Sequence, residues 1–248
     1  RKGFAPLVDG FSFARLNDLE DFTTRVTDET AAVLLEPIQG ESGIKVANDE
    51  FLQGLRHLCD ERGVLLMFDE VQCGMGRTGD FFAFERSGVR PDAIAMAKGL
   101  GGGFPIGAVW IGEEHADLFE PGSHGSTFGG GPVACRAALT VLDVIEEDDL
   151  LTRVTEHGVW FRERLDEIVS AHSRIMSGTR GRGLMIGVEM LVSASAFVKR
   201  LRERGLLTVP AGGEVVRFLP PLNVSREDLE KAARIMESVA EEWDLNED

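Results

Sequence analysis

The stretch from Asp92 to Gly107 constrains this chain most. An apolar run from Ala93 to Ala97 ends on Lys98, and a glycine-rich segment, Gly99-Leu-Gly-Gly-Gly103, follows it. The run is typical of a short buried strand, and glycines permit a sharp turn and a close approach to the backbone. We therefore expect a lysine in apolar surroundings at a strand end. Burial disfavours a charged lysine, and a neutral amine can form a Schiff base with an aldehyde.

A second apolar run, Val64 to Asp69, also ends on a polar residue. Taken singly, Lys98 is equally typical of a lysine with a buried stem, and Asp69 of a turn. Together they favour a pyridoxal phosphate site. The lysine would carry the aldehyde carbon, and the aspartate would keep the pyridine nitrogen protonated so that the ring accepts electrons.

Several motifs occur in a fixed order around these two residues. They are Leu35-Glu36-Pro-Ile-Gln-Gly-Glu41, Asp69-Glu-Val-Gln72, Ala97 to Gly107, His124-Gly-Ser-Thr127-Phe-Gly-Gly and Ala211 to Ser225. With them the chain resembles the class III aminotransferases of fold type I over nearly its whole length. The last motif is most similar to the acetylornithine branch of that family.

The order of the elements predicts the fold. A strand over Val33–Ile38, a helix over Asp49–Arg62 stopped by Gly63, and a strand over Val64–Asp69 alternate as in an α/β fold with a mostly parallel sheet. The resemblance implies the fold of type I pyridoxal phosphate transferases, and ligands of such sheets lie beyond the carboxyl ends of the strands.

The pattern changes after residue 150. We expect helices over 132–146, 150–171 and 195–204, strands over 184–190, 206–209 and 215–219, and a last helix capped by Ser225. Residues 1–150 would belong to a large cofactor-binding domain and 151–248 to a small α+β domain. Because the chain opens on Arg1 and the family has a long portion before this point, we expect the C-terminal part of a larger enzyme.

The resemblance also implies roles in cofactor binding. Lys98 would be the catalytic residue and bind the cofactor covalently, and Asp69 would pair with the pyridine nitrogen. Gln72 would donate a hydrogen bond to the phenolic oxygen, and Val71 would pack under the ring. Ser126 and Thr127 lie in a glycine-rich loop suited to a phosphate, and in resembling enzymes this threonine reaches the cofactor of the neighbouring subunit, which implies a homodimer with shared sites.

Glu41 and Arg217 form the last predicted pair. An arginine can bind a carboxylate through two parallel hydrogen bonds, so Arg217 would take the substrate carboxylate, and Glu41 would cover it when another substrate is bound. The alternative is a surface salt bridge, which contributes little.

The composition of the chain limits the classes of molecule that it is expected to bind. The chain has 248 residues with 42 acidic and 26 basic side chains, and its net charge of −16 disfavours nucleic acid and anionic membranes. The acidic surface suits either a high-salt environment or an ordinary acidic enzyme. Three widely spaced cysteines and five scattered histidines predict neither disulfides nor a metal site, and a reducing cytoplasm fits.

A dinucleotide fingerprint, Gly74-Met-Gly-Arg-Thr-Gly79, is formally present. We do not expect nucleotide binding, because the segment after it is too short and too quickly broken to be the helix that this motif requires.

The preferred interpretation is a pyridoxal-phosphate-dependent transaminase of arginine biosynthesis, acting on N-acetylornithine and 2-oxoglutarate. Alternatives are ornithine, 4-aminobutyrate or carrier-protein-linked substrates, or a glutamate-semialdehyde mutase. A non-catalytic binding protein of the same family would be expected to lack Lys98 or Asp69, and both are present.

Overall fold

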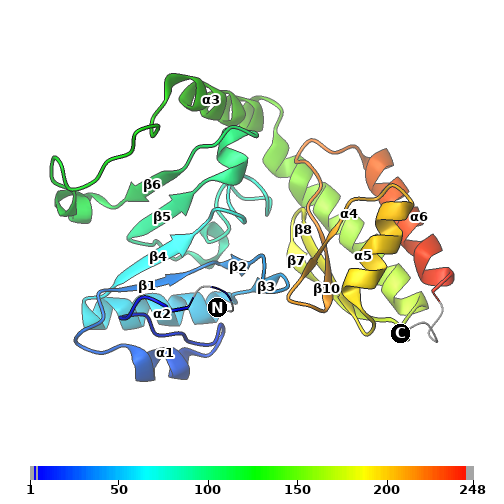
Figure 1. The fold of residues 1–248 in the computed structure, drawn as a ribbon, viewed down its shortest axis with the longest axis horizontal. Coiled ribbons are helices and arrows are strands. Elements are labelled where there is room, and N and C mark those ends of the chain that lie inside the picture. Colours follow the sequence, from blue (N-terminus) through cyan, green and yellow to red (C-terminus); the bar gives the residue numbers. More distant parts are fainter. Residues whose placement is uncertain (1–2, 4, 244–248) are drawn as a thin grey trace.

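The computed structural model describes residue 3 and residues 5–243. Two units, each a sheet with its own helices, lie side by side and are joined where α3 meets α4 (Figure 1). The first unit contains α1 (Leu19–Arg25), β1 (Ala32–Leu35), β2 (Ile38–Gln39), β3 (Lys45–Val46), α2 (Asp49–Arg62), β4 (Leu65–Asp69), η1 (Glu85–Ser87), β5 (Ala93–Met96), η2 (Lys98–Gly101), β6 (Ala108–Ile111), η3 (Glu113–Leu118) and α3 (Pro132–Glu147). The second contains α4 (Leu150–Ala171), β7 (Met176–Arg182), β8 (Met185–Met190), α5 (Ala194–Glu203), β9 (Val209–Ala211), β10 (Val215–Phe218) and α6 (Arg226–Glu241).

The main sheet of the first unit has the order β1-β4-β5-β6. β1, β4 and β5 are parallel, and β6 is antiparallel to β5. Leu35, Leu66 and Phe68 on one face pack with Phe51 and Leu55 of α2, all in one buried cluster. Parallel strands place their carboxyl ends at one edge, so this topology determines where the predicted site residues meet.

The sheet of the second unit is antiparallel, with the order β7-β8-β10-β9. Its inner face packs against α4, α5 and α6 around Phe161, Leu165, Phe197 and Met236, each no more than 1% exposed. β10 carries Arg217, and the strand is buried along its length, so the backbone under this arginine is rigidly placed.

The structure confirms the α/β class and most of the predicted elements. α2 and α4 have the predicted bounds, Gly63 ends α2 in the left-handed conformation, and Ser225 caps α6 by accepting from the Asp228 N–H. The predicted division at residues 150 and 151 stays a prediction. Among the described residues, no helix combines the length and the apolar character needed to cross a membrane.

Other predictions need correction. The strand expected over Val33–Ile38 is broken after Leu35, because Glu36 and Pro37 leave the sheet before β2 begins. The strand expected over 206–209 lies instead at Val209–Ala211. The helix α1 and the strand β7 were not predicted.

Candidate active site

Three polar side chains meet at the carboxyl ends of three adjacent strands. Leu35 of β1 pairs with Phe68 of β4, so Glu36 and Asp69 follow side by side. Asp69 in turn pairs with Ala95 of β5, the strand that leads into Lys98. The sequence predicted the ends of β4 and β5 as the site, and Glu36, from the Leu35–Glu41 motif, lies beside them.

Lys98 has an unusual backbone conformation. Its φ angle is +43°, in the left-handed region, and it begins the short 3₁₀ helix η2. A non-glycine residue in this region costs about 1–3 kcal/mol and persists only where its surroundings enforce it, often at functional sites. The apolar surroundings expected from the sequence are not what the structure shows, because Lys98 is exposed among the described residues. Its amine is therefore accessible to a ligand.

The Asp69 and Glu36 carboxyl groups have different environments. Asp69 is partly buried and accepts a hydrogen bond from the Val71 N–H at 3.0 Å. Burial raises the pKa of Glu36, and Asp69 raises it further, whereas the Gly40 N–H and the Lys98 amine lower it. Glu36 thus lies within the electrostatic reach of both predicted cofactor residues, a role that sequence reasoning did not assign to it. Its sequence signal was its place in the motif Leu35-Glu36-Pro-Ile-Gln-Gly-Glu41.

Arg217 brings the second unit to this edge. Its Nη1 donates to the Gly40 carbonyl at 2.9 Å, to Gln72 Oε1 at 2.9 Å and to Glu41 Oε1 at 2.7 Å. Gln72 Nε2 also donates to Glu41 Oε1 at 3.1 Å, which closes a triangle of side chains. The pKa of Glu41 is lowered chiefly by Arg217 and then by Gln72, and Lys98 contributes. The predicted pair exists, and the sequence did not predict that Gln72 joins it.

Two further details make Arg217 suited to a ligand. Arg217 is only 8% exposed, and its Nε is buried without a hydrogen-bond partner among the described residues. A buried unpaired donor is costly unless something else satisfies it. A Cβ added at Gly40 would lie 1.9 Å from Gln72 Oε1, so a larger residue there would displace the Gln72 side chain from its bond to Arg217.

Ser126 and Thr127 are not brought to the strand ends by this chain. They lie in the loop between η3 and α3, which extends away from the sheet in Figure 1, and every residue from 121 to 130 is exposed. Ser126 Oγ accepts from the Gly129 N–H at 3.0 Å. Val71, the other predicted contact, follows Asp69 directly and is half-buried.

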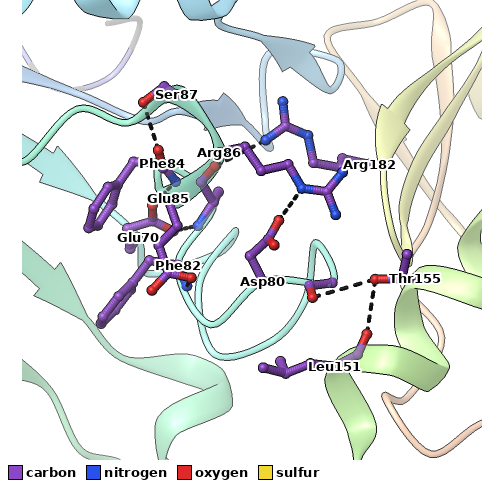
Figure 2. Close-up of polar contacts among 12 residues, drawn as sticks. Glu70, Asp80, Phe82, Phe84, Glu85, Arg86, Ser87, Leu151, Thr155 and Arg182 are labelled. Carbon is purple, nitrogen blue, oxygen red and sulfur yellow. Dashed lines mark hydrogen bonds and ion pairs between the residues drawn. The ribbon is translucent and has the colours of Figure 1, made fainter.

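Glu70 is a buried acid that sequence reasoning did not assign a role. It is 1% exposed and accepts from the backbone N–H groups of Ala83 and Phe84, both at 3.1 Å (Figure 2). It also accepts from Cys73 Sγ at 3.2 Å. Burial raises its pKa to about 7. These bonds tie the segment after Asp69 to the loop before η1, which fixes the direction in which Asp69 and Gln72 leave the sheet.

Within the described residues, one group of three side chains has the composition of a cation site. Ligand atoms of Asp92, Glu114 and His115 lie within 4.8 Å of one another. However, Asp92 is already paired with Arg56 at 2.9 Å and accepts from the Leu66 N–H at 2.6 Å. We assign no metal there.

The chain is similar to known aminotransferases in both sequence and fold. The sequence profile described as "Aminotransferase class-III" matches residues 5–240. Acetylornithine aminotransferase of Aquifex aeolicus is 46% identical over 96% of this chain and 61% of its own length. Ornithine aminotransferase 2 of Staphylococcus aureus is 46% identical over 94% of this chain and 58% of its own. The crystal structure of ornithine aminotransferase from Toxoplasma gondii superposes with a TM-score of 0.91 at 33% identity, covering 96% of this chain and 58% of that one.

The chain spans about three-fifths of the length of these curated relatives. The family profile nevertheless covers nearly the whole sequence given, and the strand-end site lies inside the matched residues. The chain therefore belongs to the class III aminotransferases.

Proposed function

We propose that the protein transfers the ω-amino group of N-acetylornithine to 2-oxoglutarate, with pyridoxal phosphate as cofactor, in arginine biosynthesis. Relatives named acetylornithine aminotransferase, at 46% and 47% identity over 96% and 95% of the chain, support this substrate. The observation that carries the proposal is the meeting of an accessible strand-end lysine, a neighbouring carboxylate and a buried arginine at one edge of a parallel sheet.

The residues at this edge fit the cofactor that the family uses. When bound, pyridoxal phosphate supplies an aldehyde that reacts with amines and a ring that accepts electrons. The exposed amine of Lys98 can bond to the aldehyde carbon, and once displaced by the substrate it can move a proton at the reacting carbon. Asp69 can hold the proton on the ring nitrogen. We assign the phenolic oxygen to Gln72 and the underside of the ring to Val71.

Arg217 is the proposed carboxylate receptor. Its guanidinium is held at Nη1 by the Gly40 carbonyl and Gln72, and the remaining N–H groups of the guanidinium are left for a substrate carboxylate. Glu41 also accepts from Nη1 and can move away, because its side chain is 71% exposed. Glutamate would bind to Arg217 with Glu41 displaced, whereas N-acetylornithine would bind with the Glu41–Arg217 pair closed.

We further propose a homodimer in the cytoplasm, with Ser126 and Thr127 contacting the cofactor phosphate of the neighbouring subunit. Large apolar side chains are exposed along the loop and α3, where Phe128 is 89% exposed and Val133 69%. An exposed apolar patch of this kind favours a partner surface. The three cysteines are free, which suits a reducing compartment.

The proposal is tested with purified holoenzyme and a panel of amino donors. N-acetylornithine, ornithine, 4-aminobutyrate and glutamate semialdehyde would each be mixed with enzyme, and loss of the cofactor's absorbance band followed before 2-oxoglutarate is added. We expect the largest rate relative to donor concentration with N-acetylornithine. A larger rate with another donor would identify that donor as the substrate in place of N-acetylornithine. Absence of reaction with every donor would overturn the proposed transaminase activity.

A further inference from the structure

A cavity separate from the strand-end site lies between the two units. Its volume is about 490 Å³, within the usual range for small-molecule sites. None of the strand-end residues described above lines it. Four arginines and two threonines do so, together with glycines and aliphatic residues: Arg86, Arg162, Arg180, Arg182, Thr78 and Thr155.

The arginines come from three separate segments. Arg86 belongs to η1, Arg162 to α4, and Arg180 and Arg182 to β7. Positions two apart on a strand share a face, so Arg180 and Arg182 are directed to the same side of the second sheet. Arg182 Nη1 donates to the Ala83 carbonyl of the first unit at 3.1 Å. Figure 2 shows the side chains of Arg182 and Arg86 extending into the same region, and both line the cavity.

The positive charges of this cavity are only partly neutralised. Arg86 is ion-paired with Asp80, and Arg180 Nη1 lies 2.8 Å from Glu189 Oε1. Among the described residues, the Arg162 guanidinium donates only to neutral groups, the Thr179 hydroxyl at 3.2 Å and the Gly181 carbonyl at 3.4 Å.

Arg182 likewise has only the Ala83 carbonyl as a hydrogen-bond acceptor, and neither it nor Arg162 has a carboxylate within ion-pair distance in the part of the chain that the structure describes. Neither guanidinium is therefore directly ion-paired, although Asp166 accepts a hydrogen bond from the Thr179 hydroxyl that Arg162 contacts.

The cavity also has polar atoms without partners. Thr78 is 1% exposed, and its Oγ1 makes no hydrogen bond to any described residue. Arg180 Nε is buried and unpaired in the same sense. Buried donors of this kind are rare in folded proteins, and each one raises the free energy of the folded state until a ligand or water satisfies it.

We propose that this cavity binds a small dianion, a molecule that carries either a phosphate group or two carboxylates. Two guanidiniums without a directly paired carboxylate, those of Arg162 and Arg182, match two negative charges, and the planar guanidinium is suited to both oxyanions because it can donate two parallel hydrogen bonds. A ligand held by Arg86 on one side and by Arg162 and Arg182 on the other would contact both units and stabilise their junction.

The test uses the purified holoenzyme and two probes, inorganic phosphate and malonate, at constant ionic strength. With its cofactor phosphate site filled, the protein should show a saturable rise in melting temperature with at least one probe. The Arg162→Gln/Arg182→Gln double variant should raise the midpoint concentration at least tenfold. Arg174→Gln, which removes an exposed arginine outside the cavity, should leave the midpoint unchanged.

The probes also separate the two sources of the anion. A response to phosphate alone identifies a phosphate-bearing ligand, a response to malonate alone a dicarboxylate, and a response to both the shared chemistry. Absence of a saturable response to either probe would overturn the proposal. So would equal midpoints in the double variant and the unaltered protein, provided that circular dichroism shows both to be folded. Neither outcome bears on the identity of the amino donor.

Discussion

Glu41 Oε1 lies 2.7 Å from Arg217 Nη1, yet the Glu41 side chain is 71% exposed and that of Arg217 is 9% exposed. The guanidinium has two further acceptors, the Gly40 carbonyl and Gln72 Oε1, which hold it in place without the carboxylate. The Glu41 side of the pair is exposed, but leaving the buried Arg217 without a carboxylate costs free energy. We therefore expect Glu41 to leave Arg217 when a substrate carboxylate takes its place, while the arginine stays where it is.

Removing the movable partner should change which amine reacts. In Glu41→Ala, Arg217 stays uncovered, so we expect faster reaction with glutamate and a shift of the diamine-type donor from its ω-amine towards its α-amine. Both half-reactions would be followed by absorbance, and the product identified by mass spectrometry. Ser42→Ala alters the exposed neighbour and serves as the control. If Glu41→Ala alters neither rates nor the amine chosen, the pair is only a salt bridge.

Lys98, which is exposed and has a left-handed backbone conformation, should be the residue that binds the cofactor covalently. Borohydride reduction of the holoenzyme, followed by peptide mass spectrometry, should find the cofactor on Lys98 and not on Lys45, a second exposed lysine of the first unit. Lys98→Ala should still bind cofactor non-covalently but lose at least about 100-fold in turnover, the lower range for a positioned acid–base group. Label on another lysine would refute the assignment.

We expect Asp69 to contribute to catalysis through its negative charge. Asp69→Asn has nearly the same shape and retains an oxygen that can accept from the Val71 N–H, but it cannot stabilise a proton on a ring nitrogen. We expect a loss of about 4 kcal/mol of transition-state stabilisation, comparable to the loss of other preorganised electrostatic partners. Turnover would be measured at saturating donor, with melting temperature as the control for folding. Turnover close to that of the unaltered protein would contradict the role.

The parts of the fold that were predictable are those with local signals. Asn48 caps α2 through a bond to the Phe51 N–H, and Gly63 ends it, so both bounds could be inferred from the chain itself. β7 could not be predicted in this way. Its sequence, Met-Ser-Gly-Thr-Arg-Gly-Arg, lacks apolar alternation, and it is a strand because β8 pairs with it along its length.

The same distinction applies to the site. Lys98 and Asp69 were predictable because each ends an apolar run, whereas the position of Gln72 between Glu41 and Arg217 depends on residues 145 positions apart in sequence. The left-handed backbone and the exposure of Lys98 likewise follow from how η2 packs. Leu100 of η2 is buried against Met75 and Ala138, contacts that no local pattern encodes.

The buried Glu70 should make stability depend on pH. Burial raises its pKa from 4.5 to about 7, so the folded state binds the proton more tightly than the unfolded state does. The contribution of Glu70 to stability is then fully present below about pH 4.5 and is lost as pH rises through about 7.

Glu70→Gln removes this titration, and its single amide oxygen can keep only one of the two backbone bonds, because the Ala83 and Phe84 N–H groups reach different carboxylate oxygens. Relative to the unaltered protein, the variant should gain stability as pH rises from 5 to 8, by up to about 3 kcal/mol at about 1.4 kcal/mol per pKa unit. Chemical unfolding at several pH values would measure the difference, and Glu156→Gln, an exposed acid on α4, should show no such trend. A difference that stays constant across this range, or that shrinks as pH rises, would show that Glu70 remains ionised in the folded protein and that its three donors outweigh its burial.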